Sequence, residues 1–446
     1  MWVLGFVLAV DSTDQSILRG VQPLIKHDFH LSDAAVGFLA SAFVLINALT
    51  TIPAGYLADR TNRTKVIGVT IVAWSGITAL TGACMNFLEL IGVRALLGFG
   101  LGVTEPSANS LLTDFYPTQQ RGRAFSIQQQ MLFVGFGLGI ALGGGIGSHF
   151  GWRWAFVIVG APGVLTSLLV FRLHEPKRGH GDRLSLGLKP SDDEEEPLPP
   201  LFEHGVLTFV GDLFRGLRDD LKTIIAIPTL RYVLVGVGVL LFSVTGVGYW
   251  LPVYLQRFAH MSLESSTSAV GGIVIVAGLG GTWFGGRIAD RYQNQISGAR
   301  IALPSYCVMI GTVLFTLSLA PLPTVAVLVI QTVAIFTLVA AIPGIRAGTG
   351  DALPATLRGA GFAAFSLVST LSGAALAPPL LGFLSDLTNL RFAFLICMPP
   401  IFIGALIMYR ARKHLDEDVA KVLMAVQRAY QEQQALEERR AAEEPT

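Results

Sequence analysis

Charged side chains are scarce in this chain of 446 residues, where Asp, Glu, Lys and Arg make up only 14% of the total. Ordinary soluble domains carry about a quarter. The charges that are present gather in segments 174–228 and 410–446, which together hold 33 of the 63. The rest of the chain cannot cover a water-exposed surface, because so large an apolar surface would aggregate. The composition therefore excludes a soluble protein and predicts one that crosses a membrane several times.

Three further absences narrow the function. The net charge of +1 provides no basic surface of the kind that nucleic acid requires, so no nucleic-acid partner is expected. Cys84, Cys307 and Cys397 lack C-x-x-C spacing, which indicates neither a disulfide framework nor a metal site. No G-x-x-x-x-G-K-[ST] string occurs, which argues against a pump driven by its own ATP hydrolysis. We expect neither a cofactor nor a metal.

The sequence has instead twelve apolar segments, each near the roughly 20 residues that a helix needs to cross about 30 Å of hydrocarbon. Runs of this length span as helices, since backbone groups must pair within their own segment. The first contains Asp11 and Asp14 and has no small-residue cleavage site, so we interpret it as a spanning helix rather than a signal peptide. The predicted spans are 2–24, 35–57, 65–85, 87–112, 124–149, 152–173, 229–257, 266–287, 299–319, 323–343, 357–384 and 390–410.

Basic residues set the orientation. They follow the second, fourth and eighth spans, whereas the connections after the third, ninth and eleventh have almost none. The positive-inside rule then places both termini in the cytosol, and we expect the protein in a cell membrane, plasma or inner. The basic residues are Arg60, Arg63, Lys65, Arg121, Arg123 and Arg291.

Segment 174–228 divides the spans into six plus six. It contains an acidic, proline-rich run that is typical of a solvated linker. In Leu201–Leu221 apolar residues recur at helical spacing, which predicts an amphipathic helix at the cytosolic interface. The predicted organisation is a six-helix bundle in 1–173, the linker in 174–228, a second bundle in 229–410 and a cytosolic helical tail without a chemical role in 411–446.

The two halves repeat a motif. Gly55–Arg63 (GYLADRTNR) follows the second span, and Gly286–Arg291 (GRIADR) follows the eighth. Two six-helix repeats joined by a long loop are the layout of transporters whose substrate site lies between the halves, near the midplane. The sequence thus predicts an all-α membrane protein with twelve transmembrane helices in two pseudo-symmetric bundles.

The G-x-L-A-D-R string resembles the first characteristic motif of the major facilitator superfamily, and Arg94–Gly100 (RALLGFG) resembles the arginine motif of its fourth span. Within that superfamily the chain is similar to the Spinster subfamily over about residues 11–410. The resemblance implies the major facilitator fold, alternating access by a rocker switch, and a lysolipid-like cargo. The strings that carry the subfamily resemblance include Pro23–Lys26, Pro106–Ser110, Gly151–Arg153, Glu175–Gly179, Trp250–Pro252 and Gly382–Asp386.

Ionisable residues inside the spans are costly and therefore point to function. Arg94 and Glu105 are eleven residues apart, so they lie within roughly 20° of one direction and are expected to face a central cavity. A rise of about 1.5 Å per residue places Asp14 roughly 12 Å and Arg94 about 10 Å below the outer surface, at a depth where they can meet. Asp11 and Glu105 lie deeper and form a possible second carboxylate level.

In Spinster-like proteins the first-span aspartate and the fourth-span arginine are implicated in proton coupling, and the resemblance assigns these roles to Asp14 and Arg94. The sequence departs from the Spinster pattern at two positions. Gln15 stands where the family usually has an arginine, and Leu101 stands where it has a glutamate, which Glu105 would supply one turn further on. The alternatives are that Glu105 pairs structurally near the cytosolic mouth, that Asp14 and Arg94 are a structural pair, and that Asp11 is exposed to water.

The loop motif has a gating role by the same resemblance. In the superfamily its aspartate faces the start of the eleventh helix, where the helix dipole favours an anion, and its distal arginine meets an acid at the end of the fourth. The resemblance implies a latch that stabilises the outward-facing state, with a weaker version in the second half, where trailing basic residues are missing. The predicted latch residues are Asp59, Arg60, Arg63 and Asp114 in the first half and Asp290 and Arg291 in the second.

Polar and aromatic residues of the spans are candidates for lining the cavity. At least one of Gln128, Gln129 and Gln130 must face it, because consecutive helical residues point about 100° apart. Trp250 and Tyr254 have a second interpretation, as aromatic belt residues at the membrane interface. The second half has few buried charges, so we expect one charged wall and one apolar wall. The candidates are Gln129, Gln130, Tyr249, Tyr254 and Gln331.

An asymmetric cavity suits an amphiphile better than a sugar. We predict a monomeric, proton-coupled secondary transporter that moves an amphipathic lipid-like substrate, such as a lysophospholipid, with protons and membrane lipids as its other partners. The alternative is a proton-driven exporter of small drugs or organic anions. An enzyme that acts on lipid within the membrane would need a nucleophile–base pair or a metal site in the cavity, and the spans contain neither.

Overall fold

The computed structural model describes residues 2–58, 62–177, 221–293, 295–353 and 368–422, together with a few isolated residues between and after these ranges. Within that part of the chain, every regular element is a helix. The first half contains α1 Trp2–Asp28, α2 Asp33–Ala58, α3 Arg63–Thr81, α4 Phe87–Phe115, α5 Thr118–Phe150 and α6 Trp152–Phe171. The second contains α9 Pro228–Phe258, α10 Leu263–Tyr292, α11 Ala299–Ser318, α12 Thr324–Asp351, the π-helix η2 Ser369–Ala375, α14 Ala377–Leu387 and α15 Leu390–Arg410.

Nine of the described helices are long and apolar enough to cross a membrane by length and composition. The other crossings are α1 and α4, which contain acidic and basic residues, and the segment that η2 and α14 form together. The predicted fold of twelve transmembrane helices is confirmed. Several helix ends differ from the predicted span ends by a few residues, and the largest difference among the described ends is at α12, which continues eight residues past its predicted end at Pro343. A long helix packed among others tolerates proline, and Arg346 therefore lies on α12.

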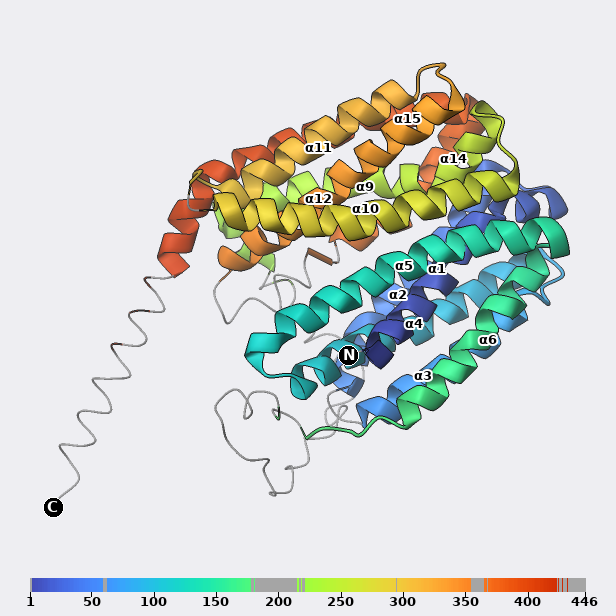
Figure 1. Cartoon of the computed structure of the whole chain (residues 1–446), viewed down its shortest axis with the longest axis horizontal. Helices are drawn as coiled ribbons and strands as arrows, with labels where there is room; N and C mark the ends of the chain where they lie inside the picture. The colour runs from blue at the N-terminus through green and yellow to red at the C-terminus, as the bar shows by residue number, and fades with distance from the viewer. Residues whose placement is uncertain are drawn as a thin grey trace.

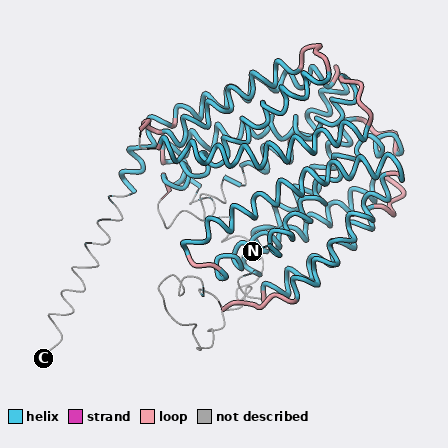
Figure 2. The backbone as a smooth tube through the Cα atoms, in the orientation of Figure 1, coloured by secondary structure: helices cyan, strands magenta, loops and turns pink. Residues whose placement is uncertain are grey.

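The helices form two bundles, with α1–α6 below and α9–α15 above in Figure 1. The loops of both bundles gather at their two ends, as Figure 2 shows. An even number of crossings brings the start of α1 and the end of α15 to the same end, toward the left of Figure 1, and we name this the inner end. The outer end is the opposite one, where α1 meets α2 and α9 meets α10. The orientation predicted above would make the inner end cytosolic.

The two bundles contact each other through glycines of α5 and α10. A Cβ atom on Gly137 would lie 2.5 Å from the carbonyl oxygen of Gly271, and one on Gly271 would lie 2.4 Å from that of Gly137. Neither position admits a side chain, so the helix backbones approach closely here. At the outer end α2 packs against α14 in the same way, since a Cβ on Gly37 would lie 2.4 Å from the carbonyl oxygen of Pro378.

The tail that follows α15 begins as a helix over residues 412–422, which packs under the second bundle. Asp416 accepts hydrogen bonds from the Ser297 hydroxyl and the Gly298 amide, just before α11. Asp418 accepts one from the Thr229 amide at the start of α9. These carboxylates cap the two helix starts, so the start of the tail has a structural role. The predicted amphipathic helix Leu201–Leu221 lies almost entirely outside the described residues.

Candidate substrate site and gates

A cavity of about 1630 Å³ lies between the bundles. Its lining residues reach toward the inner ends of several helices, including Asn109 of α4, Phe125 of α5 and Arg346 of α12. At the outer end, direct contacts between α2 and α14 close the space. The cavity is therefore closed at the outer end.

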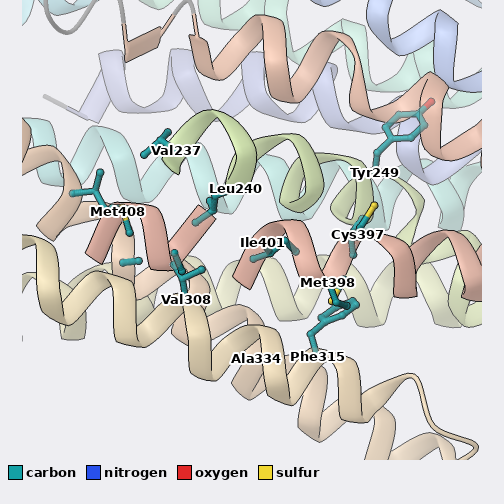
Figure 3. Close-up of a cluster of buried hydrophobic side chains, with 14 of the residues drawn as sticks. Val237, Leu240, Tyr249, Val308, Phe315, Ala334, Cys397, Met398, Ile401 and Met408 are labelled. Carbon is teal, nitrogen blue, oxygen red and sulfur yellow. The ribbon is translucent and has the colours of Figure 1, made fainter. Parts of the chain in front are cut away.

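The two walls of the cavity differ in polarity. The first bundle contributes amide side chains from three helices, namely Asn47, Asn109, Gln128, Gln129 and Gln130. The second bundle contributes a largely apolar wall, part of which Figure 3 shows: Val237, Leu240, Val308, Phe315, Met398 and Ile401. Gln129 and Gln130 line the cavity as the sequence predicts. The wall of the second bundle is largely apolar, as expected, but the described wall of the first bundle is lined mainly by amides and not by the charged residues Asp14 and Arg94.

Arg19 of α1 lines the deep end of this cavity. Its guanidinium lies 4.4 Å from the ring centroid of Phe136 of α5 and 5.7 Å from that of Tyr249 of α9. One ring comes from each bundle, so the half-buried cation sits where the bundles meet. No acidic side chain among the described residues pairs with it. The sequence reasoning missed Arg19, although it lies inside the predicted span 2–24 and an ionisable residue there is itself the signal.

Arg346 is the second guanidinium of the cavity, and it lies near the inner end of α12. Its Nη1 donates to Oε1 of Gln129 across the gap between the bundles, at 3.3 Å. Neither Asp nor Glu occurs among the described lining residues. The cavity therefore presents two positive charges and no described negative one, which favours anions.

Asp14 and Arg94 are buried inside the first bundle and do not line the cavity. Their opposite charges are close enough to interact, but among the described residues both carboxylate oxygens of Asp14 and two nitrogens of Arg94 have no hydrogen-bond partner. Arg94 stacks on Phe156 of α6, 4.5 Å from the ring centroid. The prediction that Arg94 faces the cavity is wrong for this conformation. The predicted meeting of the two charges at one depth agrees with their interaction.

Helix rotation explains where Asp14 lies. Arg19 follows it by five residues, which at about 100° per residue places the two side chains roughly 140° apart around α1.

Asp11 is also buried, so the water-exposed alternative is wrong, and it accepts a hydrogen bond of 3.1 Å from Gln15. The backbone of Glu105 lies in α4, but its side chain is outside the described part of the structure.

Three predicted cavity residues lie elsewhere. Tyr254 stacks between Phe258 and Phe394, at 5.0 Å from each ring, in the core of the second bundle. Gln331 is completely buried and does not line the cavity, and Tyr249 lies behind Arg19. Composition alone could not assign these side chains, because apolar neighbours surround a cavity wall and a bundle core alike. The belt interpretation of Trp250 and Tyr254 is wrong as well, since both are buried.

At the inner end, Arg63 forms the ion pair with Asp114 that the loop motif predicts. Its Nε also donates to Glu175 at 2.8 Å, and its Nη2 donates to the carbonyl of Pro176 at 3.0 Å. Burial alone would raise the pKa of Glu175, but hydrogen bonds from Arg63 and the Thr64 amide outweigh it and leave the pKa below its ordinary value. Asp59 and Arg60 lie outside the described residues.

The second half repeats this ion pair with residues that the sequence reasoning missed. Arg300, near the start of α11, pairs with Asp351 at the end of α12 and lies 3.6 Å from Asp290. Arg291 lies over the ring of Tyr292, 5.9 Å from its centroid. The prediction that a trailing basic partner is missing is therefore wrong. Arg300 follows Asp290 by ten residues, whereas Arg63 follows Asp59 by four, so the linear motif did not reveal it.

An outer latch centred on Asp33 closes the opposite end. Arg257 of α9 donates to both carboxylate oxygens of Asp33, at 2.7 and 2.8 Å. Lys26 of α1 pairs with the same carboxylate, and Ser385 of α14 donates to it at 2.7 Å. The Asp386 carboxylate in turn accepts hydrogen bonds from the backbone amides of Asp33 and Ala34, at 2.9 Å each. The latch joins α1 and α2 of one bundle to α9 and α14 of the other.

We predict that Asp33→Asn shifts the protein toward a state with an open outer end. The amide loses the two-point ion pair with Arg257, and a partly buried charge pair of this kind contributes enough to change the population at least about tenfold. Electron-spin distance measurements between labels at Met85 and Leu322, two exposed outer positions on different bundles, report the opening. Asp28→Asn is the matched control, because Asp28 pairs with Arg153 within one bundle. Unchanged distances in the Asp33 variant would contradict the latch.

Comparison with known proteins identifies the family to which the chain belongs. Residues 4–372 match the family model described as Major Facilitator Superfamily. The chain belongs to the major facilitator superfamily. It is thus a multi-pass membrane transporter rather than an enzyme.

Individual relatives are distant. The chain is 26% identical over 418 residues to the cis,cis-muconate transport protein of Acinetobacter baylyi, which covers 91% of this chain and 93% of that protein. It is 26% identical over 307 residues to protein spinster homolog 1 of Xenopus laevis, which covers 66% of this chain and 54% of that protein. The crystal structure of a bacterial homolog to the human lysosomal transporter Spinster, inward-facing and unoccupied, superposes with a TM-score of 0.76 at 21% identity, covering 94% and 97% of the two chains. The predicted resemblance to Spinster proteins is confirmed at the level of fold.

Proposed function

We propose that this transporter carries a small organic anion whose charged group binds Arg19. The observation that supports the proposal is the location of Arg19 at the deep end of a cavity whose described lining contains no acid. The guanidinium has aromatic rings at 4.4 and 5.7 Å and no described carboxylate beside it, so its N–H groups can donate to a ligand. A carboxylate matches the edge of a guanidinium with two parallel hydrogen bonds.

The apolar wall indicates what the rest of the anion resembles. Val308, Phe315, Met398 and Ile401 offer contact area to a hydrocarbon or unsaturated body and few polar partners to a sugar. A desolvated guanidinium without a counterion is costly, and the bound carboxylate would supply one. The name of the relative from Acinetobacter baylyi, a muconate transport protein, fits an unsaturated carboxylate.

The lysophospholipid predicted from the sequence is the second candidate. The size of the cavity and its apolar wall favour it, as does the similarity to spinster homolog 1. A zwitterionic headgroup, however, would bring its cation next to Arg19 and Arg346 with no described acid to receive it. The charge of the cavity therefore favours a simple anion over a zwitterionic lipid.

We propose proton coupling through Asp14 and Arg94 as a separate part of this function. An ionised carboxylate without a partner inside a bundle is costly, and protonation or pairing with Arg94 relieves that cost. In one state Asp14 is protonated, and in the other it pairs with Arg94; the two states differ in the position of α1 relative to α4. A change in the protonation of Asp14 thereby shifts α1, the helix that carries Arg19. We place the monomeric transporter in the cell membrane with both termini in the cytosol.

Competition with labelled cis,cis-muconate in proteoliposomes tests the substrate class. We expect benzoate and unlabelled muconate to inhibit uptake, and benzamide and muconic diamide, which have the same shape without the charge, to fail. Lysophosphatidylcholine is added as a further competitor. Inhibition by the lipid with none by the carboxylates would overturn the proposal in favour of the second candidate. Equal inhibition by benzoate and benzamide would show that charge is not recognised.

A further inference from the structure

A second, smaller cavity lies between the bundles at the outer end. Its volume is about 100 Å³, and its polar lining residues are Gln22, Lys26, Gln256 and Arg257. That volume holds a few water molecules. The Oε1 atom of Gln22 is buried there without a hydrogen-bond partner, which is the condition of a group that meets water or a ligand in another state.

The two cavities are lined by successive residues of the same two helices. On α1, Arg19 lines the large cavity and Gln22 and Lys26 line the small one, a spacing of three and four residues that keeps them on one face. On α9, Gly248 and the neighbouring turn line the large cavity, and Arg257 lines the small one. On one face of α1 the lining thus continues from the substrate cavity to the outer latch, whereas on α9 Gly248 and Arg257 are nine residues apart and point to opposite sides.

Tyr249 of α9 lies between Gly248, which lines the large cavity, and Trp250, which lines the small one. Its two polar contacts outside α9 both go to the first bundle: its hydroxyl donates to the carbonyl of Val36 at 3.1 Å, and its carbonyl accepts from Gln22 at 3.1 Å. Its ring faces Arg19 from the outer side of the large cavity. Figure 3 shows it at one end of the buried cluster, away from the side chains that line the apolar wall.

We propose that Tyr249 is the barrier between the substrate cavity and the outer side, and that the two cavities are parts of one path for the anion. Opening the outer end moves α9 away from α1 and α2, which must break both hydrogen bonds of Tyr249 together with the Asp33 latch. The path then presents the cations Arg19, Lys26 and Arg257 in sequence, and the last two are paired with Asp33 while the outer end is closed. Only this last point rests on the proposed function, since a barrier at Tyr249 does not require an anion at Arg19.

Thiol labelling tests the barrier without any substrate. In a background with the three native cysteines replaced, Gly248→Cys places a thiol in the large cavity, where an added Cβ meets only Nη1 of Arg19 at 4.0 Å. A membrane-impermeant reagent is applied to the side opposite the termini. We expect Tyr249→Phe, which keeps the ring and loses the bond to Val36, to raise the labelling rate about fivefold. Asp33→Asn should raise it further.

Tyr254→Phe is the matched control, because it makes the same change one and a half turns along α9 but in the bundle core. It should leave the rate unchanged. Gln22→Leu removes the other hydrogen bond of Tyr249 and should also raise the rate, so the test does not depend on one variant folding. If Asp33→Asn raises the rate while Tyr249→Phe and Gln22→Leu match the control, Tyr249 is not the barrier. Failure of benzoate to compete for uptake would instead refute the proposed function alone.

Discussion

Replacing Arg19 with glutamine is expected to lower kcat/KM for carboxylate uptake by about 100-fold or more, because the anion then enters an apolar cavity without its counterion. Arg19→Lys should recover part of the activity, since the ammonium keeps the charge and loses the planar two-point geometry. Initial uptake rates in proteoliposomes measure both variants. Size-exclusion profiles of the purified proteins confirm that they remain folded.

Arg346→Gln is the control for Arg19. Arg346 is exposed at the mouth of the cavity, where water screens its charge, so its removal should reduce uptake by only a few-fold. The reverse ranking, with Arg19→Gln near wild type and Arg346→Gln inactive, would move the anion site to the mouth. In that case the substrate would replace the hydrogen bond between Arg346 and Gln129.

Asp14→Asn is expected to abolish the acceleration of uptake by an imposed pH gradient. The amide has nearly the same shape but does not release a proton, so the position of α1 no longer responds to pH. Exchange of labelled for unlabelled substrate without a gradient should continue, because Arg19 and the cavity wall are unchanged. Uptake with and without the gradient, measured on the same vesicles, gives the ratio that decides the question.

Asp28→Asn is the matched control for proton coupling, since it makes the same change on the same helix at an outer ion pair. Its gradient dependence should equal that of wild type. If Asp14→Asn also keeps the full dependence, the assignment of coupling to Asp14 falls, and the buried pair with Arg94 is structural. If wild type itself ignores the gradient, the transporter is not proton-coupled.

The sequence predicted the fold well because the membrane imposes one simple requirement. Segments of about 20 apolar residues cross as helices, so counting them yields the number of crossings without any tertiary information. The same arithmetic predicted that Asp14 and Arg94 lie at similar depths, and their charges do interact in the structure. It did not predict that Arg94 points away from the cavity, because the rotation of α4 within its bundle depends on packing against α1 and α6.

The functional residues that were not predicted from the sequence were missed for different physical reasons. Arg19 lay inside a predicted span and was detectable as an intramembrane charge. Arg346 fell outside the predicted span 323–343, and α12 continues to Asp351. The outer latch joins Lys26, Asp33, Arg257 and Ser385, which only the folded chain brings together, and no pattern in one sequence reveals such contacts.

The most direct measurement is a structure of the purified transporter with 4-iodobenzoate, in which the iodine marks the ligand. The account predicts the carboxylate at about 2.8 Å from the Arg19 guanidinium, with the iodine against the apolar wall of the second bundle. The account would be contradicted if the ligand bound elsewhere in the protein while Arg19 kept its two aromatic contacts and had no anion beside it. An empty cavity at ligand concentrations that inhibit uptake would also contradict it.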